Sequence, residues 1–568
     1  MANVTIYSAG EKTAEIEHAK YLVHLVSIAP SFEQSHYLSG LGYSDVFDQA
    51  DMDTLVYLPL LSRDAVQVPD LDKAKGFIGH WKPGAYRQLI IVSSAAIYGS
   101  RPHNPGLMDE SQSLTPGQSN RLARAWKDFE EICTRGMEEY PESIVTILRP
   151  SHVLIPGKRD YLGGLLTKRW AFTLAGHDPS LQWLHPEDLA GAVVGVAEHQ
   201  CGGVFNISPA GVTTLRASLR LAGTYRIPTP RWPQRILRWI GPQTHVSPID
   251  HLEYIRYNWT VSSGKLTEET GFIPKKSSFD AIIHFLNGPS EESPLKKRLA
   301  VRKQALPATF DDFGLDKKYL AAYSRTLLKF MEDFYWRFEC RGLEHIPLDS
   351  RAMLAGVHRG FMPLDGVMTM HLIAKETGRH PRFLIHPTLI KFPFQFNFMT
   401  KIGGIIACQQ NADHVLEKDG LVGFYPEGIQ GAFRYYKGVY ELGKFGRNEF
   451  VRMALRNQAP IVPFVTVGNA EIFPIFGKIK WQWWMRFSLW PVFPFAPPFP
   501  FLPVPLPSKW HIRFLEPIHI EKEYPPEAAN DHEIVRAISD EVRSRMQAAI
   551  NEMLAERKHI FWGSIFKD

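Results

Sequence analysis

The residue types best suited to acid–base chemistry lie in the stretch AGVHRGFMPLDG, residues 355–366. A short apolar run ends near His358, and Asp365 follows after six intervening residues. A neutral imidazole can remove the proton from a hydroxyl group as that hydroxyl attacks a carbonyl carbon. A carboxylate bonded to the other ring nitrogen fixes the tautomer and stabilises the imidazolium ion. The pair therefore predicts a general base and its orienting partner, and an ordinary turn is the alternative.

Two further patterns follow this stretch along the chain. FYPEGIQGAFR (424–434) places Glu427 and Gly428 after an apolar run, and APIVPFVTVG (459–468) is an apolar run around Pro463. A single histidine near a strand end is more often structural than catalytic, and a single Pro-Glu-Gly is more often a turn. Their occurrence in this order, at the ends of expected strands, favours a catalytic site over separate structural features.

Residues 320–550 resemble the glycerolipid acyltransferase superfamily. His358 and Asp365 match its first motif, Tyr425 to Gly428 match its third, and Ile461 to Pro463 match its fourth. The resemblance implies transfer of a fatty acyl group from a CoA or acyl-carrier-protein thioester to a lipid hydroxyl. It also implies that Glu427 helps to bind the acceptor. We expect direct transfer without a covalent acyl-enzyme, because no serine or cysteine stands beside the histidine as a nucleophile.

The sequence departs from the usual motifs of this superfamily at two positions. Six residues separate His358 from Asp365 instead of four, a spacing similar to that of the monoacylglycerol and diacylglycerol acyltransferase-like branch. Gln430 stands where phosphate-using relatives carry arginine, and glutamine cannot pair bidentately with a phosphate. We therefore expect a neutral lipid alcohol as acceptor, although Arg434 or Lys437 could bind a phosphate instead. The expected substrate-binding residues are Arg359, Glu427, Gly428, Gln430, Arg434 and Pro463.

The first half of the chain alternates short apolar runs with helical patterns. Such alternation predicts an α/β fold with a doubly wound, Rossmann-like parallel sheet. The second half is a separate α/β domain. We expect strands at 54–61, 88–99, 143–150 and 202–209 and helices at 120–140 and 185–200 in the first half.

SSAAIYGS (93–100), LRPSHVLIPG (148–157) and GGVFNISP (202–209) resemble the extended short-chain dehydrogenase family of nucleotide-sugar epimerases. The resemblance places Ser94 at the family's catalytic serine, as the one candidate cofactor-site residue. Asn120 and Arg124 stand where the family has its Tyr-x-x-x-Lys pair, and asparagine has no acidic phenol. Residues 1–30 contain only Gly10 where a glycine-rich turn would hold the cofactor pyrophosphate. We expect a degenerate domain with a structural, docking or ligand-sensing role, and NAD(P) is not expected as a required cofactor.

Residues 289–312, PSEESPLKKRLAVRKQALPATFDD, are rich in proline, serine and mixed charge. They predict a linker between an epimerase/dehydratase-like domain at 1–288 and an acyltransferase-like domain at 313–568. An apolar stripe then predicts a helix that begins near Asp316. Packing on its own domain is the favoured interpretation of this helix, and a position at a membrane interface is the alternative. The stripe consists of Leu320, Tyr323, Leu327, Met331, Phe334 and Phe338.

Composition excludes several classes of protein. The net charge of +5 is too small to indicate a nucleic-acid partner. The four cysteines form no close pair, which predicts no metal site and no disulfide framework. The N-terminus lacks the pattern of a secretory signal, and no run of 18 apolar residues exists that would span a membrane.

The segment KWQWWMRFSLWPVFPFAPPFPFLPVPLPSKW, residues 480–510, is dense in aromatic residues and prolines. Prolines forbid a continuous spanning helix, and tryptophan prefers the membrane interface. We expect part of this segment, 481–507, to dip into one leaflet, which places the protein at the cytoplasmic face of a membrane as a peripheral or monotopic protein. The alternative is an ordered loop packed on the core. Two alternative functions remain open: a nucleotide-sugar epimerase or oxidoreductase that uses NAD(P), and a non-catalytic lipid-binding scaffold.

Overall fold

The computed structural model forms two compact units, Met1–Gly314 and Leu315–Asp568, which are described separately below. Residues 289–309, most of the expected linker, lie outside the described residues, so the expected domain boundaries stay a prediction. The structure describes residues 4–8, 35–39, 52–59, 68–81, 86–114, 120–156, 160–230, 250–287, 310–386, 393–446, 448–482, 492–502 and 504–566.

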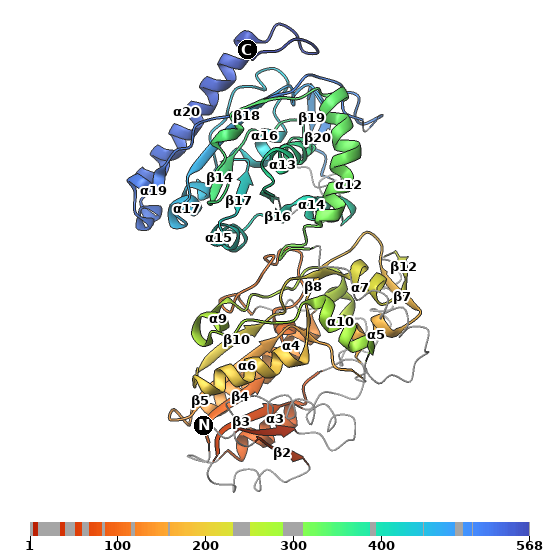
Figure 1. The fold of residues 1–568 in the computed structure, drawn as a ribbon, viewed down its shortest axis with the longest axis vertical. Helices are drawn as coiled ribbons and strands as arrows, with labels where there is room; N and C mark the ends of the chain where they lie inside the picture. Colours follow the sequence, from red (N-terminus) through yellow and green to blue (C-terminus); the bar gives the residue numbers. More distant parts are fainter. Residues whose placement is uncertain are drawn as a thin grey trace. The chain divides into compact units, whose positions relative to one another are not determined.

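The first unit is built on a six-stranded sheet with the order β10-β5-β4-β3-β1-β2, in which all neighbouring strands are parallel (Figure 1). This is the parallel α/β sheet that the alternating pattern predicted. The strands are β1 (Val4–Ser8), β2 (Ser35–Ser39), β3 (Met52–Leu58), β4 (Tyr86–Val92), β5 (Ile144–Pro150) and β10 (Gly203–Ile207).

Helices cover both faces of this sheet because its strands are apolar on both sides. Successive side chains of a strand point to opposite faces. Tyr57 of β3 packs on one face, where its ring stacks on Phe77 with centroids 4.0 Å apart. The adjacent Val56 packs on the other face with Val193. The covering helices are α3 (Leu71–Gly79) and α4 (Arg121–Met137) on the first face and α6 (Pro186–Glu198) on the second.

The strand expected at 88–99 is shorter than predicted, for a local reason. β4 ends at Val92, and Ala95–Tyr98 form a 3-10 turn, η1. The hydroxyl of Ser94 accepts the backbone N–H of Ala96 at 3.1 Å and so caps this turn. The smaller elements of the unit are β6 (His152–Val153), α5 (Tyr161–Thr167), β7 (Trp170–Leu174), β8 (Ser180–Leu181), β9 (Trp183–Leu184), β11 (Thr213–Thr214), α7 (Leu215–Leu221), β12 (Tyr225–Thr229), η2 (Asp250–Ile255), α9 (Gly264–Thr270) and α10 (Ser278–Asn287).

The second unit contains a seven-stranded sheet with the order β13-β21-β18-β14-β17-β15-β16. Its neighbouring strands are parallel except for β18 and β21, which are antiparallel. The mixed α/β character of this unit agrees with the expected fold class. The strands are β13 (Glu339–Arg341), β14 (Ala352–Ala355), β15 (Arg382–Ile385), β16 (Gly404–Ile406), β17 (Leu421–Phe424), β18 (Ile461–Val467) and β21 (His511–Phe514).

Helices pack around this second sheet, and α13 carries the expected catalytic aspartate in its first turn. The long C-terminal helix α20 packs against β18, and Asp531 caps its N-terminus by accepting the N–H of Glu533 at 2.8 Å. The helices are α12 (Lys317–Tyr323), α13 (Leu364–Thr377), α14 (Pro393–Ile402), α15 (Gln409–Glu417), α16 (Gly428–Ala432), α17 (Glu449–Arg456), α19 (Ile520–Glu523) and α20 (His532–Glu556), with the short turns η5 (Leu343–His345) and η7 (Pro526–Asn530), and a hairpin of β19 (Gly477–Ile479) and β20 (Phe493–Phe495) completes the unit.

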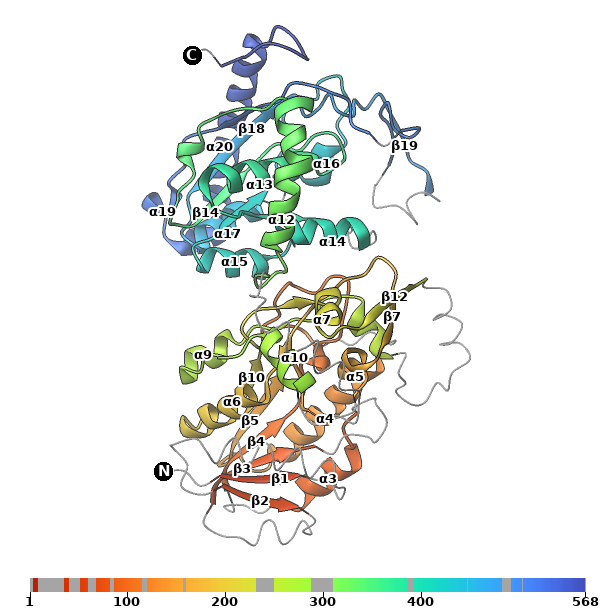
Figure 2. The ribbon, with the colours of Figure 1, turned by 45° about the vertical axis from the view of Figure 1, so that its right-hand side comes forward.

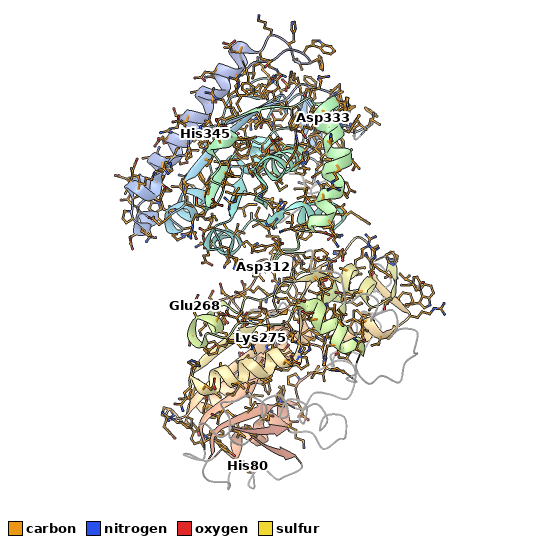
Figure 3. The ribbon with its side chains drawn as sticks, in the orientation of Figure 1. His80, Glu268, Lys275, Asp312, Asp333 and His345 are labelled. Carbon is orange, nitrogen blue, oxygen red and sulfur yellow. The ribbon has the colours of Figure 1, made fainter. Side chains whose placement is uncertain are left out.

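The helix expected from Asp316 begins as predicted but is not regular along its length. Asp316 caps α12 by accepting the N–H groups of Lys318 and Tyr319. Two π-helical segments then follow, η3 (Ser324–Leu328) and η4 (Met331–Tyr335). Figure 3 marks Asp333 in the second of them. Leu320 is buried, whereas Leu327 and Phe334 are exposed, so the apolar stripe lies only partly against the core. Among the described residues, no helix has the length and apolar character needed to cross a membrane.

Candidate active site

The strand register brings the chemistry-bearing loops of the second unit to one edge of the sheet. Ala355, the last residue of β14, pairs with Phe424 of β17 on one side and with Pro463 of β18 on the other. His358 and Glu427 each follow their strand end by three residues. Since the carboxyl ends of adjacent parallel strands meet at one edge, both side chains arise at the same place.

The six-residue connection returns Asp365 to His358. The Nδ1 atom of His358 lies 2.9 Å and 2.7 Å from the two carboxylate oxygens of Asp365. The connection turns through Gly360, whose φ of +77° suits glycine, and through Phe361, whose φ is +26°. The ring of Phe361 is buried and packs 5.0 Å from that of Phe473, which fixes the turn in the core.

Gly356 shows how closely the loop between β14 and α13, residues 356–363, lies on the neighbouring strand β18. We call this loop the histidine loop. A Cβ atom at this position would come within 2.1 Å of the ring of Phe464, so a larger residue would displace the loop. Glycine is therefore required two residues before His358 for its small size, since its φ is one that other residues also adopt.

The carboxylate of Asp365 is set to accept a hydrogen bond from the imidazole. Its side chain is fully buried. It accepts the backbone N–H of Arg359 at 3.0 Å and that of Gly366 at 2.8 Å, and the amide of Asn469 lies 3.5 Å away. Its place in the first turn of α13 also favours negative charge through the helix dipole. We infer that Nδ1 carries the proton and that Nε2 is the basic nitrogen.

Tyr425 supports the His358 ring from one side. The two rings are stacked, with centroids 4.9 Å apart and an angle of 22° between their planes. Burial raises the pKa of the Tyr425 phenol well above its usual value, with the charge of Asp365 adding to the rise, so the phenol stays neutral. The His358 side chain retains 15% exposure, and its Nε2 has no hydrogen-bond partner among the residues that the structure describes.

Glu427 is held by two arginines and a backbone amide. Its Oε2 accepts Nη1 of Arg359 at 2.6 Å, and its Oε1 accepts Nε of Arg434 at 3.1 Å and the N–H of Gly443 at 2.8 Å. The Arg359 side chain is fully buried and also donates to the carbonyls of Val439 and His358. Burial lowers the pKa of the Arg359 guanidinium, and the charge of Glu427 opposes that shift. The ion pair between Arg359 and Glu427 therefore connects the histidine loop to the loop after β17 that carries Glu427 and Gly428.

The remaining expected site residues lie around this centre. Gly428 has a φ of +56°, which explains a glycine after Glu427, and Gln430 is exposed on α16. Pro463 lies beside Ala355 in the sheet. The substrate-binding roles expected for these residues and for Arg359, Glu427 and Arg434 stay predictions. Sequence reasoning gave no role to Tyr425, Asn469 or Gly443, although Asn469 follows the strand end of β18 and could have been found by that signal.

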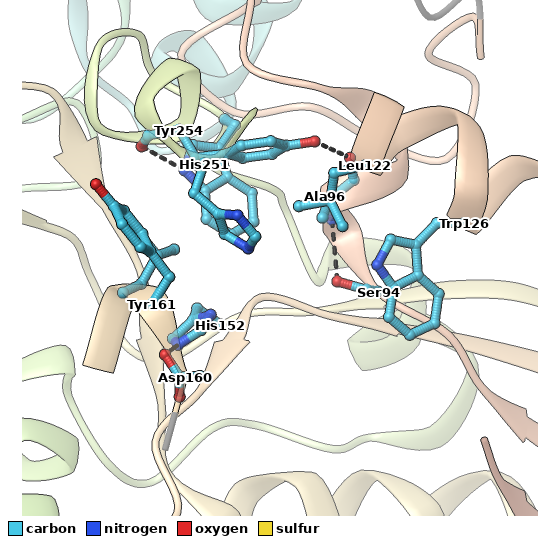
Figure 4. Close-up of a pocket in the computed structure, with 11 residues that line it drawn as sticks. Ser94, Ala96, Leu122, Trp126, His152, Asp160, Tyr161, His251 and Tyr254 are labelled. Atoms are coloured by element: carbon cyan, nitrogen blue, oxygen red, sulfur yellow. Dashed lines mark hydrogen bonds and ion pairs between the residues drawn. The ribbon is translucent and has the colours of Figure 1, made fainter. Parts of the chain in front are cut away.

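The first unit has its own small pocket, which contains Ser94 (Figure 4). Nε2 of His152 lies 3.1 Å from Oδ1 of Asp160 at this pocket, and Tyr161 and Tyr254 supply two phenols. Burial raises the pKa of Tyr161 to about 12. The hydroxyl of Tyr254 donates to the carbonyl of Ala96 at 2.7 Å. With its pKa raised this far, the Tyr161 phenol is not prepared for proton transfer near neutral pH.

Asn120 and Arg124, which stand at the positions of the family's tyrosine and lysine, have other roles here. Asn120 is the N-cap of α4, where its Oδ1 accepts the N–H of Ala123 at 3.1 Å, and Arg124 is exposed on the helix surface. These residues do not fit the proton-transfer role in a nicotinamide-dependent reaction, and no reaction is assigned to this pocket. The segment after β1, where the family has its glycine-rich turn and this sequence has only Gly10, lies outside the described residues.

Comparison with known proteins supports this division into two kinds of domain. The chain is 35% identical over 259 residues to an uncharacterized protein of Mycobacterium tuberculosis, which covers 44% of this chain and 72% of that protein. It is 34% identical over 261 residues to an uncharacterized protein of Mycobacterium leprae, covering 45% and 70%. The chain belongs to the family of these mycobacterial proteins. A model of the family described as Acyltransferase matches residues 337–467, and one of the NAD dependent epimerase/dehydratase family matches residues 81–208. The chain thus joins an epimerase-like domain to an acyltransferase domain.

Two more distant similarities were also found. Over 144 residues, the chain is 32% identical to phytyl ester synthase 2 of Arabidopsis thaliana, covering 24% of this chain and 20% of that protein. The structure is similar to that of a UDP-N-acetylglucosamine 4-epimerase from Bacillus cereus, with 10% identity, a TM-score of 0.37, and coverage of 54% of this chain and 98% of that one. A TM-score this low carries no argument about the fold, which is described here by the strand order of the parallel sheet.

Proposed function

We propose that the acyltransferase domain transfers a fatty acyl group from a CoA or acyl-carrier-protein thioester to the hydroxyl of a neutral glycerolipid. The observation that carries this proposal is the contact of His358 Nδ1 with both oxygens of Asp365, beside Glu427 at the same sheet edge. The acyltransferase family match supports the reaction class.

In the proposed reaction, Nε2 of His358 takes the proton of the acceptor hydroxyl while its oxygen attacks the thioester carbonyl. The carbon–sulfur bond then breaks, and the imidazolium returns the proton to the departing thiolate. Asp365 stabilises the imidazolium between these two steps. A cysteine nucleophile is not part of this mechanism: burial raises the pKa of the Cys408 thiol to about 11, so it is not a thiolate at neutral pH.

A neutral acceptor is supported by the side chains beside Glu427. Gln430 cannot form the bidentate pair that binds phosphate, and Arg434 already donates to Glu427. The similarity to a protein named for phytyl ester synthesis, an ester of a neutral alcohol, points the same way.

The test is an acyl-transfer assay with monoacylglycerol, diacylglycerol, glycerol 3-phosphate and lysophosphatidic acid as acceptors and acyl-CoA or acyl-carrier protein as donor. We expect kcat/KM for the neutral acceptors to exceed that for the phosphorylated ones by about tenfold or more, because Gln430 supplies no guanidinium and Nε of Arg434 already donates to Glu427. Gln430→Arg is the matched variant and should narrow this difference. Preference of the wild type for a phosphorylated acceptor would contradict the proposed substrate class.

We further propose that the acyltransferase domain contacts a bilayer through an apolar surface next to its site. Tyr335 donates to the carbonyl of Pro505 at 2.6 Å, which places η4 beside the Pro-rich segment. Phe499 of that segment packs on Phe361 of the histidine loop, with centroids 5.2 Å apart. The segment therefore packs partly on the core and partly exposes apolar side chains, of which Phe501 is 90% exposed.

Exposed apolar residues from η3 to η4 and of the Pro-rich segment form what we call the apolar surface. They are Leu327, Phe330, Phe334, Phe501, Leu502, Val504 and Leu506. Residues 483–491 of the expected membrane segment lie outside the described residues.

Replacing both Phe330 and Phe334 by serine should lower the partition of the full chain onto phospholipid vesicles by about tenfold or more, because each ring loses its transfer into the interface. Co-sedimentation with vesicles measures this. Leu348→Ser is the matched control, since Leu348 is 61% exposed before the amino end of β14, at the other end of the sheet from His358. Equal losses for both variants would contradict a specific membrane surface.

A further inference from the structure

A second exposed aromatic surface lies in the epimerase-like domain, on the two-stranded sheet of β7 and β12. The strands are parallel neighbours, and they lie side by side at the margin of this domain in both ribbon views (Figures 1 and 2). Trp170, Phe172 and Tyr225 are exposed by 49%, 62% and 60%. Trp170 pairs with Tyr225 in the register, and their rings lie 5.1 Å apart. We call these three residues the aromatic patch.

The backbone beneath the aromatic patch is firmly held. The N–H of Tyr225 donates to the carbonyl of Arg169 at 2.9 Å. Arg226 turns inward and donates to the hydroxyl of Thr173 at 2.7 Å and to the carbonyl of His177 at 3.0 Å. The three rings are therefore held outward by the strand geometry while the alternate residues are engaged on the inner side.

The exposed charges on and just before the two strands are positive, while Asp178 acts on the inward guanidinium of Arg226. Lys168 and Arg169 are exposed immediately before β7, and the guanidinium of Arg169 lies 5.7 Å from the centre of the Trp170 ring. The stretches KRWAFTL (168–174) and YRIPT (225–229) contain no aspartate or glutamate. Residues 231–249, which follow β12, lie outside the described residues.

We propose that the aromatic patch, together with Lys168 and Arg169, docks the epimerase-like domain on an anionic lipid bilayer. Tryptophan and tyrosine rings are favoured in the headgroup region, where the apolar ring and the polar tip are both satisfied. Lysine and arginine next to them are attracted by anionic headgroups. The combination of exposed rings and cations, without an acidic side chain on either strand, matches such a surface. The patch gives this domain a role that does not depend on NAD(P) or on acyl transfer.

The experiment measures the partition of the full chain onto vesicles of phosphatidylcholine with about 30% phosphatidylglycerol, and onto phosphatidylcholine alone. The double variant Trp170→Ser/Phe172→Ser should bind both kinds of vesicle about tenfold or more weakly. Lys168→Gln/Arg169→Gln should weaken binding to the anionic vesicles by about tenfold and leave binding to phosphatidylcholine nearly unchanged. Ile273→Ser is the matched control, because Ile273 is 67% exposed in the same domain and should have little effect.

Each variant is also made in the Phe330→Ser/Phe334→Ser background, so that binding by this domain is separated from binding by the acyltransferase domain. The proposal is overturned if the aromatic variant binds vesicles like the wild type or loses no more than Ile273→Ser. It is also overturned if light scattering shows a wild-type dimer that the aromatic variant dissociates, because a second copy would then cover the patch. A large drop in thermal midpoint with unchanged vesicle binding would mean that the chain itself covers it.

Discussion

Replacing His358 by alanine is expected to lower the rate of acyl transfer by about a hundredfold to ten-thousandfold, because the acceptor hydroxyl then loses its general base. Asp365→Asn should cause a loss of similar order while preserving the shape of the side chain. Its amide N–H group, turned toward Nδ1, would make that nitrogen an acceptor and put the ring proton on Nε2, where the base is needed. The measurement is kcat/KM with the best neutral acceptor, and the loss should appear mainly in kcat.

The control for these variants is His345→Ala. His345 belongs to the same domain (Figure 3) and precedes β14, whose other end leads to His358. Its Nδ1 lies 3.2 Å from the backbone carbonyl of Phe514. Its replacement should leave kcat within about threefold of the wild type while removing an imidazole of comparable exposure. Thermal unfolding checks that all three variants are folded. A His358→Ala protein that turns over at the wild-type rate would rule out His358 as the base.

The parts of this site that could be predicted from sequence are those fixed by short-range pattern. The apolar runs before His358, Glu427 and Pro463 indicate strands, and parallel strands deliver their carboxyl ends to one edge. The order of the motifs therefore sufficed to bring their loops together. The spacing of six residues did not show whether Asp365 can reach His358. In the structure it does so through a turn in which Gly360 and Phe361 have positive φ values and the Phe361 ring is buried.

The contacts that could not be predicted depend on tertiary register and on which side of a loop faces inward. Nothing local to Arg359 indicates that its guanidinium is buried against Glu427, 68 residues later. The same holds for the stacking of Tyr425 on His358 and for the approach of Asn469 to Asp365. The helix predicted after Asp316 is present, but its spacing did not indicate the two π-helical segments, and part of the stripe is exposed.

The pair formed by Arg359 and Glu427 is expected to be the most sensitive part of the domain's stability. Glu427→Gln leaves the fully buried guanidinium of Arg359 without its anion, and the free energy of unfolding should fall by about 3–5 kcal/mol. Arg359→Met should cost less, because Glu427 keeps Arg434 and the N–H of Gly443. Arg434→Gln, which removes the 30% exposed partner, is the matched control and should cost about 1 kcal/mol or less. The free energies of unfolding of the three variants are measured by urea unfolding of the full chain, monitored by a spectroscopic probe in this domain.

The double variant Arg359→Met/Glu427→Gln separates a positioning role of Glu427 from a role in acceptor binding. With neither charge present, no buried ion is left unpaired, so stability should recover by about 1–3 kcal/mol relative to Glu427→Gln alone. If Glu427 also contacts the acceptor, kcat/KM should stay low in the double variant despite this recovery, with a raised KM. If its only role is to hold Arg359 and the histidine loop, activity should return together with stability. If the double variant loses as much stability as the two single variants together, the proposed coupling of the two loops is contradicted, because residues in one buried ion pair do not act independently.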